Sequence, residues 1–440
     1  MDWRFRPPKP RIVIPANSIP VVHILNFVLF TLALLIIISL NLPLFSTAST
    51  KAYDWTRIRY RSPNSTPQAH GVCPGIEKTT KPVLIIARVS SESATWHEPL
   101  KEKYHLCVYT SDAPRSSPSS SSDTTPVLET PANRAHEALP YLTFIIDNYA
   151  SLPEHLGMVF IHGSRFAWHN DHPDYDNLAL LHSLNVSSAL ADSGYANLKC
   201  DWTASTCVKD GVEPQAGWTN QARRVIEPWN AKVVSDAEMA GSMMQVFGGG
   251  SSSSSKKTRT RLSGSDILRS QCCAQFVVAR KNIVQHTCDE YIALRQWLLD
   301  GTRITPSSSS SKESRTAVNA AKAAAHPDDR IAGRIMSYLW HILFLPRDQI
   351  VQIGLDNDSL SSSSSQAKKV VDEGEVAEQL SLAKLNALAC PSARDCYCRL
   401  YGRCALTSCR EDESRCDGQY RVPPGFRLAK DVTAAGEPLS

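Results

Sequence analysis

Short apolar runs of strand length alternate with segments of helical periodicity along this chain, and this alternation restricts its fold more than any other feature. The apolar runs cover residues 82–87, 105–109, 158–162 and 276–278. Apolar residues at helical spacing occur over 138–149, 291–298 and 331–344. Strands that alternate with helices form mainly parallel sheets with helices on their faces. We therefore predict an α/β fold with a mainly parallel sheet flanked by helices, of the kind that nucleotide-sugar transferases use.

The helix predicted over residues 138–149 has two local signals at its start. Asn133 precedes it and is a candidate N-cap, because an Asn side chain accepts a hydrogen bond from a first-turn N–H group. Pro140 has no backbone N–H, so we expect the helix to begin near Leu139 or to kink there.

The apolar run Ile24–Leu40 is typical of a membrane-spanning helix. Thirteen of its seventeen residues are Ile, Leu, Phe or Val, and Asn26 is its one strongly polar residue. These thirteen favour insertion by about 4–8 kcal/mol, and the run is about 26 Å long as a helix, just enough for the hydrocarbon core. We expect a transmembrane signal anchor at residues 21–45. The alternative is a signal peptide cleaved near Ser46–Ala48, where small residues stand.

Composition divides the rest of the chain. Ser tracts, which bury too little apolar surface to become ordered, occupy residues 116–122, 251–255, 307–311 and 361–365. The predicted organisation is a cytosolic basic tail (1–20), the anchor (21–45), a flexible stem (46–80), an α/β lumenal domain with disordered Ser-rich insertions (81–346), a variable insertion (347–389), a cysteine-rich module (390–425) and a disordered tail (426–440).

Charge and cysteine content narrow the class of protein. The formal net charge is only +4, and the one locally basic stretch adjoins a Ser tract, so we expect no nucleic-acid partner. Thirteen cysteines indicate an oxidising compartment and leave at least one thiol unpaired. Glycosylation motifs at Asn64, Asn185 and Asn357 agree with a lumenal glycoprotein.

Six of the cysteines lie between Cys390 and Cys416. We expect up to three disulfides within this cluster, whose connectivity has fifteen possibilities, with a zinc site as the alternative. Cys200 and Cys207 are close enough in sequence for a small disulfide loop. The neighbours Cys272 and Cys273 are expected to pair with distant partners or to stay reduced.

The densest group of polar side chains follows the third apolar run. Ligands of α/β sheets bind at the carboxyl ends of strands, so a site is expected in this loop. Asp174, Asp176 and His162 are the predicted metal ligands, because paired carboxylates hold the divalent cation, Mn²⁺ or Mg²⁺, that neutralises a diphosphate leaving group. The alternative is ordinary turn chemistry without a ligand.

Further candidates lie in the same loop and at the start of the helix predicted over 138–149. His169 and Asp171 are the predicted catalytic residues, one of them as general base. Binding of the donor or cofactor is predicted for Arg134, Glu137, Trp168 and Asn170. An Arg at a helix start suits phosphate, and a Trp suits a sugar ring. For the helix start the alternative is a plain cap with first-turn charges.

Many short motifs together carry a family resemblance. They lie at residues 133–137, 141–149, 152–153, 160–162, 168–171, 194–200, 272–276, 295–298, 333–334, 338–341, 390–392, 396–398 and 401–404. Over roughly residues 83–425 the chain resembles a family of mostly fungal proteins catalogued as a domain of unknown function, number 3431. It departs from the family pattern with Ala135 and Leu345 where a Gly is usual, and with His172 where a second Asp is usual. The resemblance implies an N-terminal anchor and the secretory pathway, but no activity.

Two functional hypotheses follow. The first is a metal-dependent, glycosyltransferase-like enzyme that uses a nucleotide sugar, held by a single membrane span in the Golgi, the endoplasmic reticulum or the cell surface. The second is a non-catalytic lumenal or surface protein that binds a glycan or a partner. A metal-dependent hydrolase is a third, weaker alternative. Gly-rich phosphate loops and a Gly-x-Ser-x-Gly elbow are missing from the sequence, which counts against kinases, P-loop enzymes and ordinary esterases.

Overall fold

The computed structural model describes residues 19–41, 51–112, 128–248, 260–302, 324–353 and 378–417, apart from residues 63, 69–70, 94, 204 and 209–210. The four Ser tracts lie outside these residues. The chain forms two compact units, residues 1–50 and 51–440. In the first unit, helix α1 covers Ile19–Asn41. We predicted a membrane anchor over residues 21–45, but no helix among the described residues is both long and apolar enough to cross a membrane.

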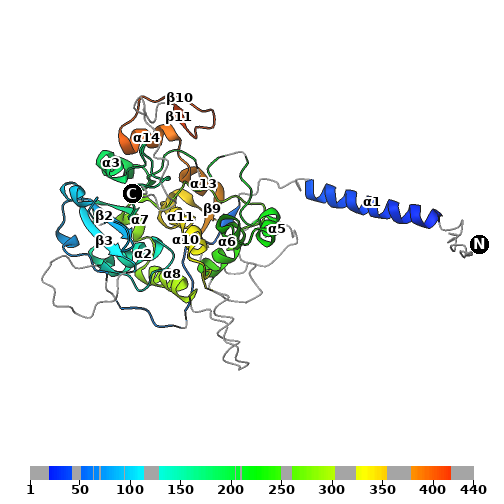
Figure 1. Ribbon diagram of the computed structural model, residues 1–440, viewed down its shortest axis with the longest axis horizontal. Helices are drawn as coiled ribbons and strands as arrows, with labels where there is room; N and C mark the ends of the chain where they lie inside the picture. Colours follow the sequence, from blue (N-terminus) through cyan, green and yellow to red (C-terminus); the bar gives the residue numbers. More distant parts are fainter. Residues whose placement is uncertain are drawn as a thin grey trace, which may run out of the picture. The chain divides into compact units, whose positions relative to one another are not determined.

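The largest sheet of the second unit has six strands in the order β4-β3-β2-β5-β7-β6, of which β2 and β3 are labelled in Figure 1. The four predicted runs are β2 (Val83–Arg88), β3 (His105–Thr110), β5 (Gly157–His162) and β7 (Phe276–Ala279). Short strands close the edges, β4 (Leu128–Glu129) and β6 (Tyr195–Asn197). Strand β2 is parallel to β3 and β5, and β3 is parallel to β4, whereas β7 is antiparallel to β5 and β6. The predicted α/β fold with a mainly parallel sheet is confirmed.

Both faces of this sheet are buried, which explains why its strands are continuous apolar runs. In β2, Val83 and Ile85 face one hydrophobic core, and Leu84 and Ile86 face the other. The first core is covered by α2 (Ala138–Asp147) and α8 (Cys288–Asp300), which pack on each other. The second core is covered by α3 (Asn177–Ser183), α4 (Val186–Leu190) and α14 (Ala393–Tyr401).

Helix α2 begins at Ala138, with Glu137 and not Asn133 at its N-cap position. The reason is the loop before it, where Ala135 and His136 have φ angles of 54° and 52°. This left-handed backbone cannot belong to a right-handed helix, so the helix starts after it. Gly adopts this conformation without steric cost, whereas residues with a side chain, such as Ala135 and His136, rarely do. Pro140 falls in the first turn, where its missing N–H breaks no helical hydrogen bond.

Residues 51–62, which we predicted to be part of a flexible stem, pack into the second unit. Strand β1 (Ala52–Tyr53) pairs with β9 (Glu378–Ser381), and β8 (Val351–Ile353) completes a small antiparallel sheet. Trp55 is buried, stacks on Tyr53 with ring centroids 4.1 Å apart, and donates from Nε1 to the carbonyl of Thr260 at 2.8 Å. The prediction was based on the average composition of residues 46–80, in which a few buried aromatic residues have little weight.

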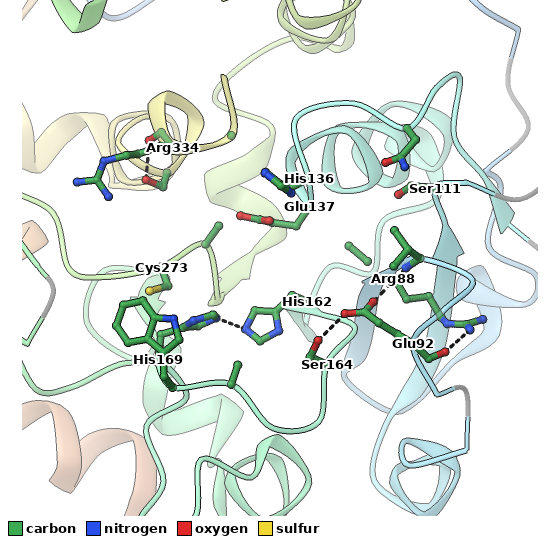
Figure 2. Close-up of a pocket in the computed structure, with 18 residues that line it drawn as sticks. Arg88, Glu92, Ser111, His136, Glu137, His162, Ser164, His169, Cys273 and Arg334 are labelled. Atoms are coloured by element: carbon green, nitrogen blue, oxygen red, sulfur yellow. Dashed lines mark hydrogen bonds between the residues drawn. The ribbon is translucent and has the colours of Figure 1, made fainter. Parts of the chain in front are cut away.

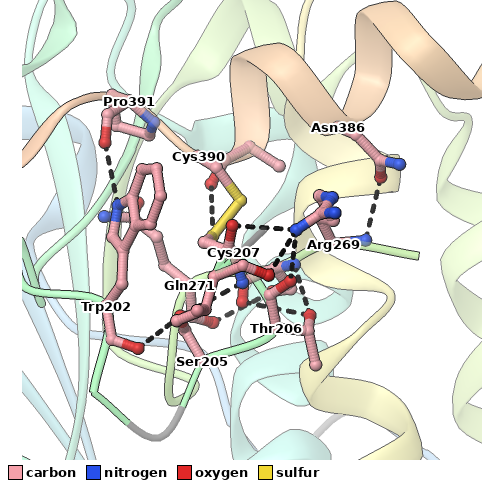
Figure 3. Close-up of a disulfide and its surroundings, with 12 residues drawn as sticks. Trp202, Ser205, Thr206, Cys207, Arg269, Gln271, Asn386, Cys390 and Pro391 are labelled. Atoms are coloured by element: carbon pink, nitrogen blue, oxygen red, sulfur yellow. Dashed lines mark hydrogen bonds between the residues drawn. A yellow bond between two sulfur atoms is a disulfide. The ribbon is translucent and has the colours of Figure 1, made fainter. Parts of the chain in front are cut away.

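The C-terminal cysteines join the main domain and are not a separate module. Cys200 pairs with Cys396 and Cys207 with Cys390, so the predicted loop between Cys200 and Cys207 is wrong. Around the second bridge, Arg269 donates to the carbonyls of Thr206, Cys207 and Val208 (Figure 3). Cys398–Cys404 and Cys409–Cys416 close short loops within the predicted cluster, and Cys73 pairs with Cys107.

Cys272 and Cys273 pair with each other, against our expectation of distant partners or reduced thiols. All thirteen cysteines belong to the described residues, and Cys288 is the free one, as their odd number requires.

Further helices pack around these elements, and all of them except α5 contribute buried residues to the first core. They are α5 (Trp218–Ile226), α6 (Ala231–Gly248), α7 (Arg280–Ile283), α10 (Asp329–Ser337), α11 (Trp340–Phe344), α12 (Arg347–Ile350) and α13 (Leu382–Ala389). Short 3-10 helices cover Ile76–Lys78, Glu98–Glu102 and Tyr149–Ser151, and β10 (Thr407–Cys409) pairs with β11 (Cys416–Asp417). The helix predicted over 331–344 is divided into α10 and α11. The described ends of the predicted insertion at 347–389 build α12, β8, β9 and α13.

Candidate functional site

A cavity of about 520 Å³, whose lining includes several charged side chains, lies where the strand order of the central sheet reverses. Strands β3 and β4 follow β2 on one side, whereas β5 lies on its other side. In open α/β sheets the loops diverge at such a point and leave a crevice for ligands. The cavity is lined by residues at and beyond the carboxyl ends of β2 and β5, among them Arg88, Glu92, His162 and Ser164 (Figure 2).

Two carboxyl groups face this cavity. Glu92 follows β2 and accepts hydrogen bonds from the backbone N–H of Val89 at 3.0 Å and from the Ser164 hydroxyl. Glu137 stands at the start of α2 and is half-buried. Desolvation raises the pKa of Glu137; its own backbone and His136 oppose the rise, and the negative charge of Glu92 adds to it. The pair therefore carries an electrostatic repulsion that a cation between the two would relieve.

Gly163 explains how Glu92 reaches this position. A Cβ at residue 163 would collide with the Glu92 carboxylate and would come within 2.8 Å of the Arg88 Cα. Because residue 163 has no side chain, a carboxylate from the β2 loop occupies the space beside the end of β5. The strand end therefore presents an acidic group, although its own residues are His162 and Gly163.

His162 and His169 face each other across the cavity wall, with their Nε2 atoms 2.5 Å apart (Figure 2). Desolvation lowers the pKa of His162 well below its ordinary value, and His169 lowers it further. Desolvation and then the charge of Lys199 lower the pKa of His169 to about 4. Both rings are therefore neutral at pH 7, and one Nε2–H donates to the other Nε2.

Two arginines bring positive charge to the cavity. Arg88 ends β2 and donates to the backbone carbonyl of Glu92. Arg334 comes from α10 and donates to the Tyr338 hydroxyl at 3.2 Å, over whose ring it also lies. Gly333 brings α10 against the loop before α2, since a Cβ there would lie 2.9 Å from the His136 ring. Guanidinium groups in this setting suit a phosphate or a carboxylate ligand.

Apolar surface completes the walls. Trp168 lies at the cavity with 54% of its area exposed, and its ring meets that of His169 edge-on. Cys273 lines the cavity as half of the Cys272–Cys273 disulfide and has a φ angle of 76°. Its carbonyl accepts from the Asn197 side chain at 2.9 Å. A flat indole is the usual platform for a sugar or a base.

Asp171 and Asn170, predicted in catalysis and binding, are both buried in structural networks away from the cavity lining. Asp171 accepts from the backbone N–H of Cys200 and from the Tyr397 hydroxyl, at 2.7 and 2.9 Å. Desolvation raises the pKa of Asp171 to about 6. Asn170 donates to the carbonyls of Arg165 and Tyr175 and thereby shapes the loop.

The predicted metal pair, Asp174 and Asp176, does not line the cavity either. Asp176 caps α3 by accepting from the Leu178 N–H, and forms a two-point ion pair with Arg165 at 2.7 and 3.0 Å. Asp174 is half exposed and 4.0 Å from His172. Of the three predicted metal ligands, the structure brings His162 alone to the cavity.

Arg134 has a structural position as well. It is buried, pairs with Asp329 and donates to the carbonyls of Leu298, His326 and Pro327. These contacts tie the loop before α2 to the start of α10. Of the four predicted binding residues, Glu137 and Trp168 line the cavity, whereas Arg134 and Asn170 support its walls.

A second cavity of about 560 Å³ adjoins the first and shares Ser164 with it. Its lining includes Trp96, Pro99, Phe166 and Leu178, the hydroxyl residues Ser93 and Thr95, and Arg165. Trp96 is fixed by a hydrogen bond from Nε1 to the carbonyl of Gly163 at 2.7 Å. Ser164, hydrogen-bonded to Glu92, therefore stands between the two cavities.

Arg88, Glu92, Cys273 and Arg334 were missed as site residues. Arg88 and Glu92 follow a predicted strand, so the strand-end argument that identified the loop after 158–162 applied to them equally. For Arg334 and Cys273 the sequence gives no local signal of proximity to the cavity.

Comparison with known proteins identifies a family whose function is unknown. A family model described as "Protein of unknown function (DUF3431)" matches residues 84–399, so the chain belongs to this family. No curated protein and no solved structure matches the chain.

Proposed function

We propose that this DUF3431 protein is a glycosyltransferase-like enzyme whose cavity at the strand reversal binds the diphosphate and sugar of a nucleotide-sugar donor. The observation that supports this most is the combination, in one cavity at that point of the sheet, of two arginines, two glutamates and a neutral histidine pair. Arg88 and Arg334 supply charge for the diphosphate, and Trp168 supplies a stacking surface for a ring.

Glu92 and Glu137 replace Asp174 and Asp176 in the proposed cation site. Mn²⁺ and Mg²⁺ in transferases are held by one or two carboxylates together with the phosphates of the substrate. The described residues contain one ready-made trio of metal-ligand side chains, Cys73, His105 and Cys107, and its cysteines form a disulfide. We therefore place the cation at the two glutamates only when the donor is bound, since its phosphates complete the coordination.

The proposed reaction uses His169 as the base. The acceptor hydroxyl attacks the anomeric carbon of the sugar, the bond from that carbon to the diphosphate oxygen breaks, and the hydroxyl proton passes to the imidazole of His169. Its pKa of about 4 keeps this imidazole unprotonated at neutral pH, and it also makes the imidazole a weaker base than one whose pKa lies near 7.

The second cavity is the proposed acceptor site. It meets the donor cavity at Ser164, and its Trp96 and Phe166 offer ring surfaces beside the hydroxyls of Ser93 and Thr95. Aromatic and hydroxyl groups together suit a carbohydrate. The disulfides favour an oxidising environment, and we propose the secretory pathway as the location.

A melting experiment on the full chain tests the proposal. Nucleoside diphosphates and nucleotide sugars with different bases are added with and without Mn²⁺. A ligand at a hundred times its Kd stabilises the folded state by about 2.7 kcal/mol, so binding raises the melting temperature. We expect a Mn²⁺-dependent rise for one class of nucleotide. A well-folded sample whose melting temperature stays constant across the panel would rule the proposal out.

A non-catalytic glycan-binding protein is the second candidate, favoured by the exposure of Trp168 at the cavity. The two candidates differ in what they need from Glu137. A lectin-like protein would bind a glycan array equally well after Glu137→Gln and would release no nucleoside diphosphate from any donor.

A further inference from the structure

Helix α5 turns its apolar side away from the protein. Trp218, Val225 and Ile226 lie on this side, because residues seven and eight positions apart share a helix face. They are 70%, 81% and 69% exposed, and Trp229, just beyond the helix, is 72% exposed. An exposed apolar group of this size marks an interaction surface in soluble domains. We call these four residues the α5 stripe.

The polar side of α5 faces the domain. Gln221 donates to the carbonyl of Ala237 in α6 at 2.7 Å, and Asn220 is buried and donates to the carbonyl of Pro214 at 2.9 Å. A helix that only covers a core has the reverse arrangement, with apolar residues inward. The orientation of α5 is fixed by these hydrogen bonds, so the exposure of the stripe is built into the fold.

The stripe starts where the chain enters the second unit. Gly217, the residue before α5, lies against Gly264, since a Cβ on Gly217 would be 3.3 Å from the Gly264 carbonyl. Two residues further, Asp266 binds the Lys51 ammonium and the Tyr53 hydroxyl. Lys51 is the first residue of the second unit.

We propose that the α5 stripe docks on a lipid bilayer, with Trp218 and Trp229 in the interfacial layer. Trp is the side chain that membrane interfaces favour, because its indole has an apolar body and an N–H that stays hydrated. Val225 and Ile226 add aliphatic surface that enters the acyl boundary, and Arg223 and Arg224 lie beside them near the headgroups, each paired with a glutamate. This proposal is independent of the proposed enzymatic activity.

Fluorescence quenching by brominated lipids tests the docking on the full chain. The chain is mixed with, or reconstituted into, phosphatidylcholine vesicles whose acyl chains carry bromine, and its tryptophan emission is compared with that in unbrominated vesicles. Bromine quenches only an indole that it touches. We expect quenching in the wild type that is mostly lost in Trp218→Phe/Trp229→Phe, although the Phe rings keep the surface apolar.

Two further variants separate docking from folding. Val225→Ser/Ile226→Ser keeps both tryptophans and should also lose most of the quenching, because the stripe no longer enters the bilayer. Val72→Ser is the matched control, since Val72 is a single exposed apolar residue outside the stripe, and its quenching should equal that of the wild type.

Quenching that is missing in the wild type, or that is unchanged in the two stripe variants, would overturn the proposal. So would a dimer in detergent solution that Val225→Ser/Ile226→Ser dissociates, because the stripe would then be covered by a second copy of the chain.

Discussion

His162 and His169 lie in an environment that differs strongly from that in an unfolded chain. Each imidazole has lost water, and each stands beside the other, so the folded state disfavours protonation of both. A neutral pair is a hydrogen-bond relay, whereas a doubly protonated pair would place two positive charges in contact. The pair therefore makes both the cavity and the stability of the fold sensitive to mild acid.

We predict that protonation of this pair destabilises the protein between about pH 6.5 and pH 4. The unfolded state binds protons at the ordinary histidine pKa of about 6.5, and folded His169 binds them at about 4, so the free energy of unfolding falls as the pH falls through this window. His169 alone should contribute about 2 kcal/mol of loss between pH 7 and pH 5. Denaturant unfolding of the wild type and of His169→Gln at both pH values measures it.

The raised pKa values of Asp171 and Glu137 increase the free energy of unfolding as the pH falls, which opposes the effect of the histidines. The informative quantity is therefore the difference in pH dependence between the wild type and the variant. His155→Gln changes an exposed histidine and is the control, which should keep the wild-type pH dependence. An equal loss of stability between pH 7 and pH 5 in the wild type and in His169→Gln would contradict this account of the pair.

At the scale of elements, the contact between the β2 loop and the end of β5 forms the acidic side of the cavity. We predict that Gly163→Ala breaks it, because the new Cβ would collide with the Glu92 carboxylate and approach the Arg88 backbone. Overpacking of this kind costs about 1–3 kcal/mol. The displaced Glu92 should also lose its Ser164 partner, so Mn²⁺-dependent ligand binding should weaken. Chemical denaturation and ligand-dependent melting measure the two effects.

Gly241→Ala is the matched control for this substitution. Gly241 lies inside α6, where an added Cβ has no neighbour closer than 3.8 Å. There Ala should stabilise the helix by about 0.5–1 kcal/mol. If Gly163→Ala behaved like Gly241→Ala, the proposed position of Glu92 would be wrong.

The sequence predicted the elements better than the site. Long apolar runs identified β2, β3, β5 and β7, but β4 and β6 have two or three residues and too little pattern to recognise. The loop after β5 was identified by the strand-end argument, and His162, Trp168 and His169 do line the cavity. Asp176, which we predicted to bind a metal, caps α3 in the structure, and in sequence a capping carboxylate looks the same as a metal ligand. Glu92 was missed because its role depends on the space that Gly163 leaves in another strand.

At the scale of the whole molecule, two nested disulfides hold the C-terminal segment on the sheet. The bridges Cys200–Cys396 and Cys207–Cys390 attach α14 and the end of α13, and the OH of Tyr397 joins Asp171 beneath them. The carboxylate that we predicted to be catalytic is thus part of this attachment. The loop after β5 therefore depends on residues that follow it by more than two hundred positions.

We predict that the losses of stability caused by removing each of the two disulfides are non-additive. If one disulfide is removed and the other is kept, the unfolded chain gains only the freedom of a loop of about 13 residues. This lowers the free energy of unfolding by about 3 kcal/mol. With both removed, a loop of almost two hundred residues opens as well, which adds about 5 kcal/mol. Denaturant unfolding of Cys200→Ser/Cys396→Ser, of Cys207→Ser/Cys390→Ser and of the combined variant measures this. Additive losses would show that the segment is held by its packing instead.

The central claim is that the ligand site is the cavity with Glu92 and Glu137 and not the Asp174–Asp176 loop. Calorimetric titration of the full chain with Mn²⁺ and the nucleotide that raises its melting temperature most tests it directly, in the wild type and in two variants with the same carboxylate-to-amide change. Glu137→Gln should weaken binding by about tenfold or more, since a charged contact contributes about 1.5–3 kcal/mol, and Asp174→Asn should leave the Kd unchanged. Loss of binding in Asp174→Asn with normal binding in Glu137→Gln would contradict the account.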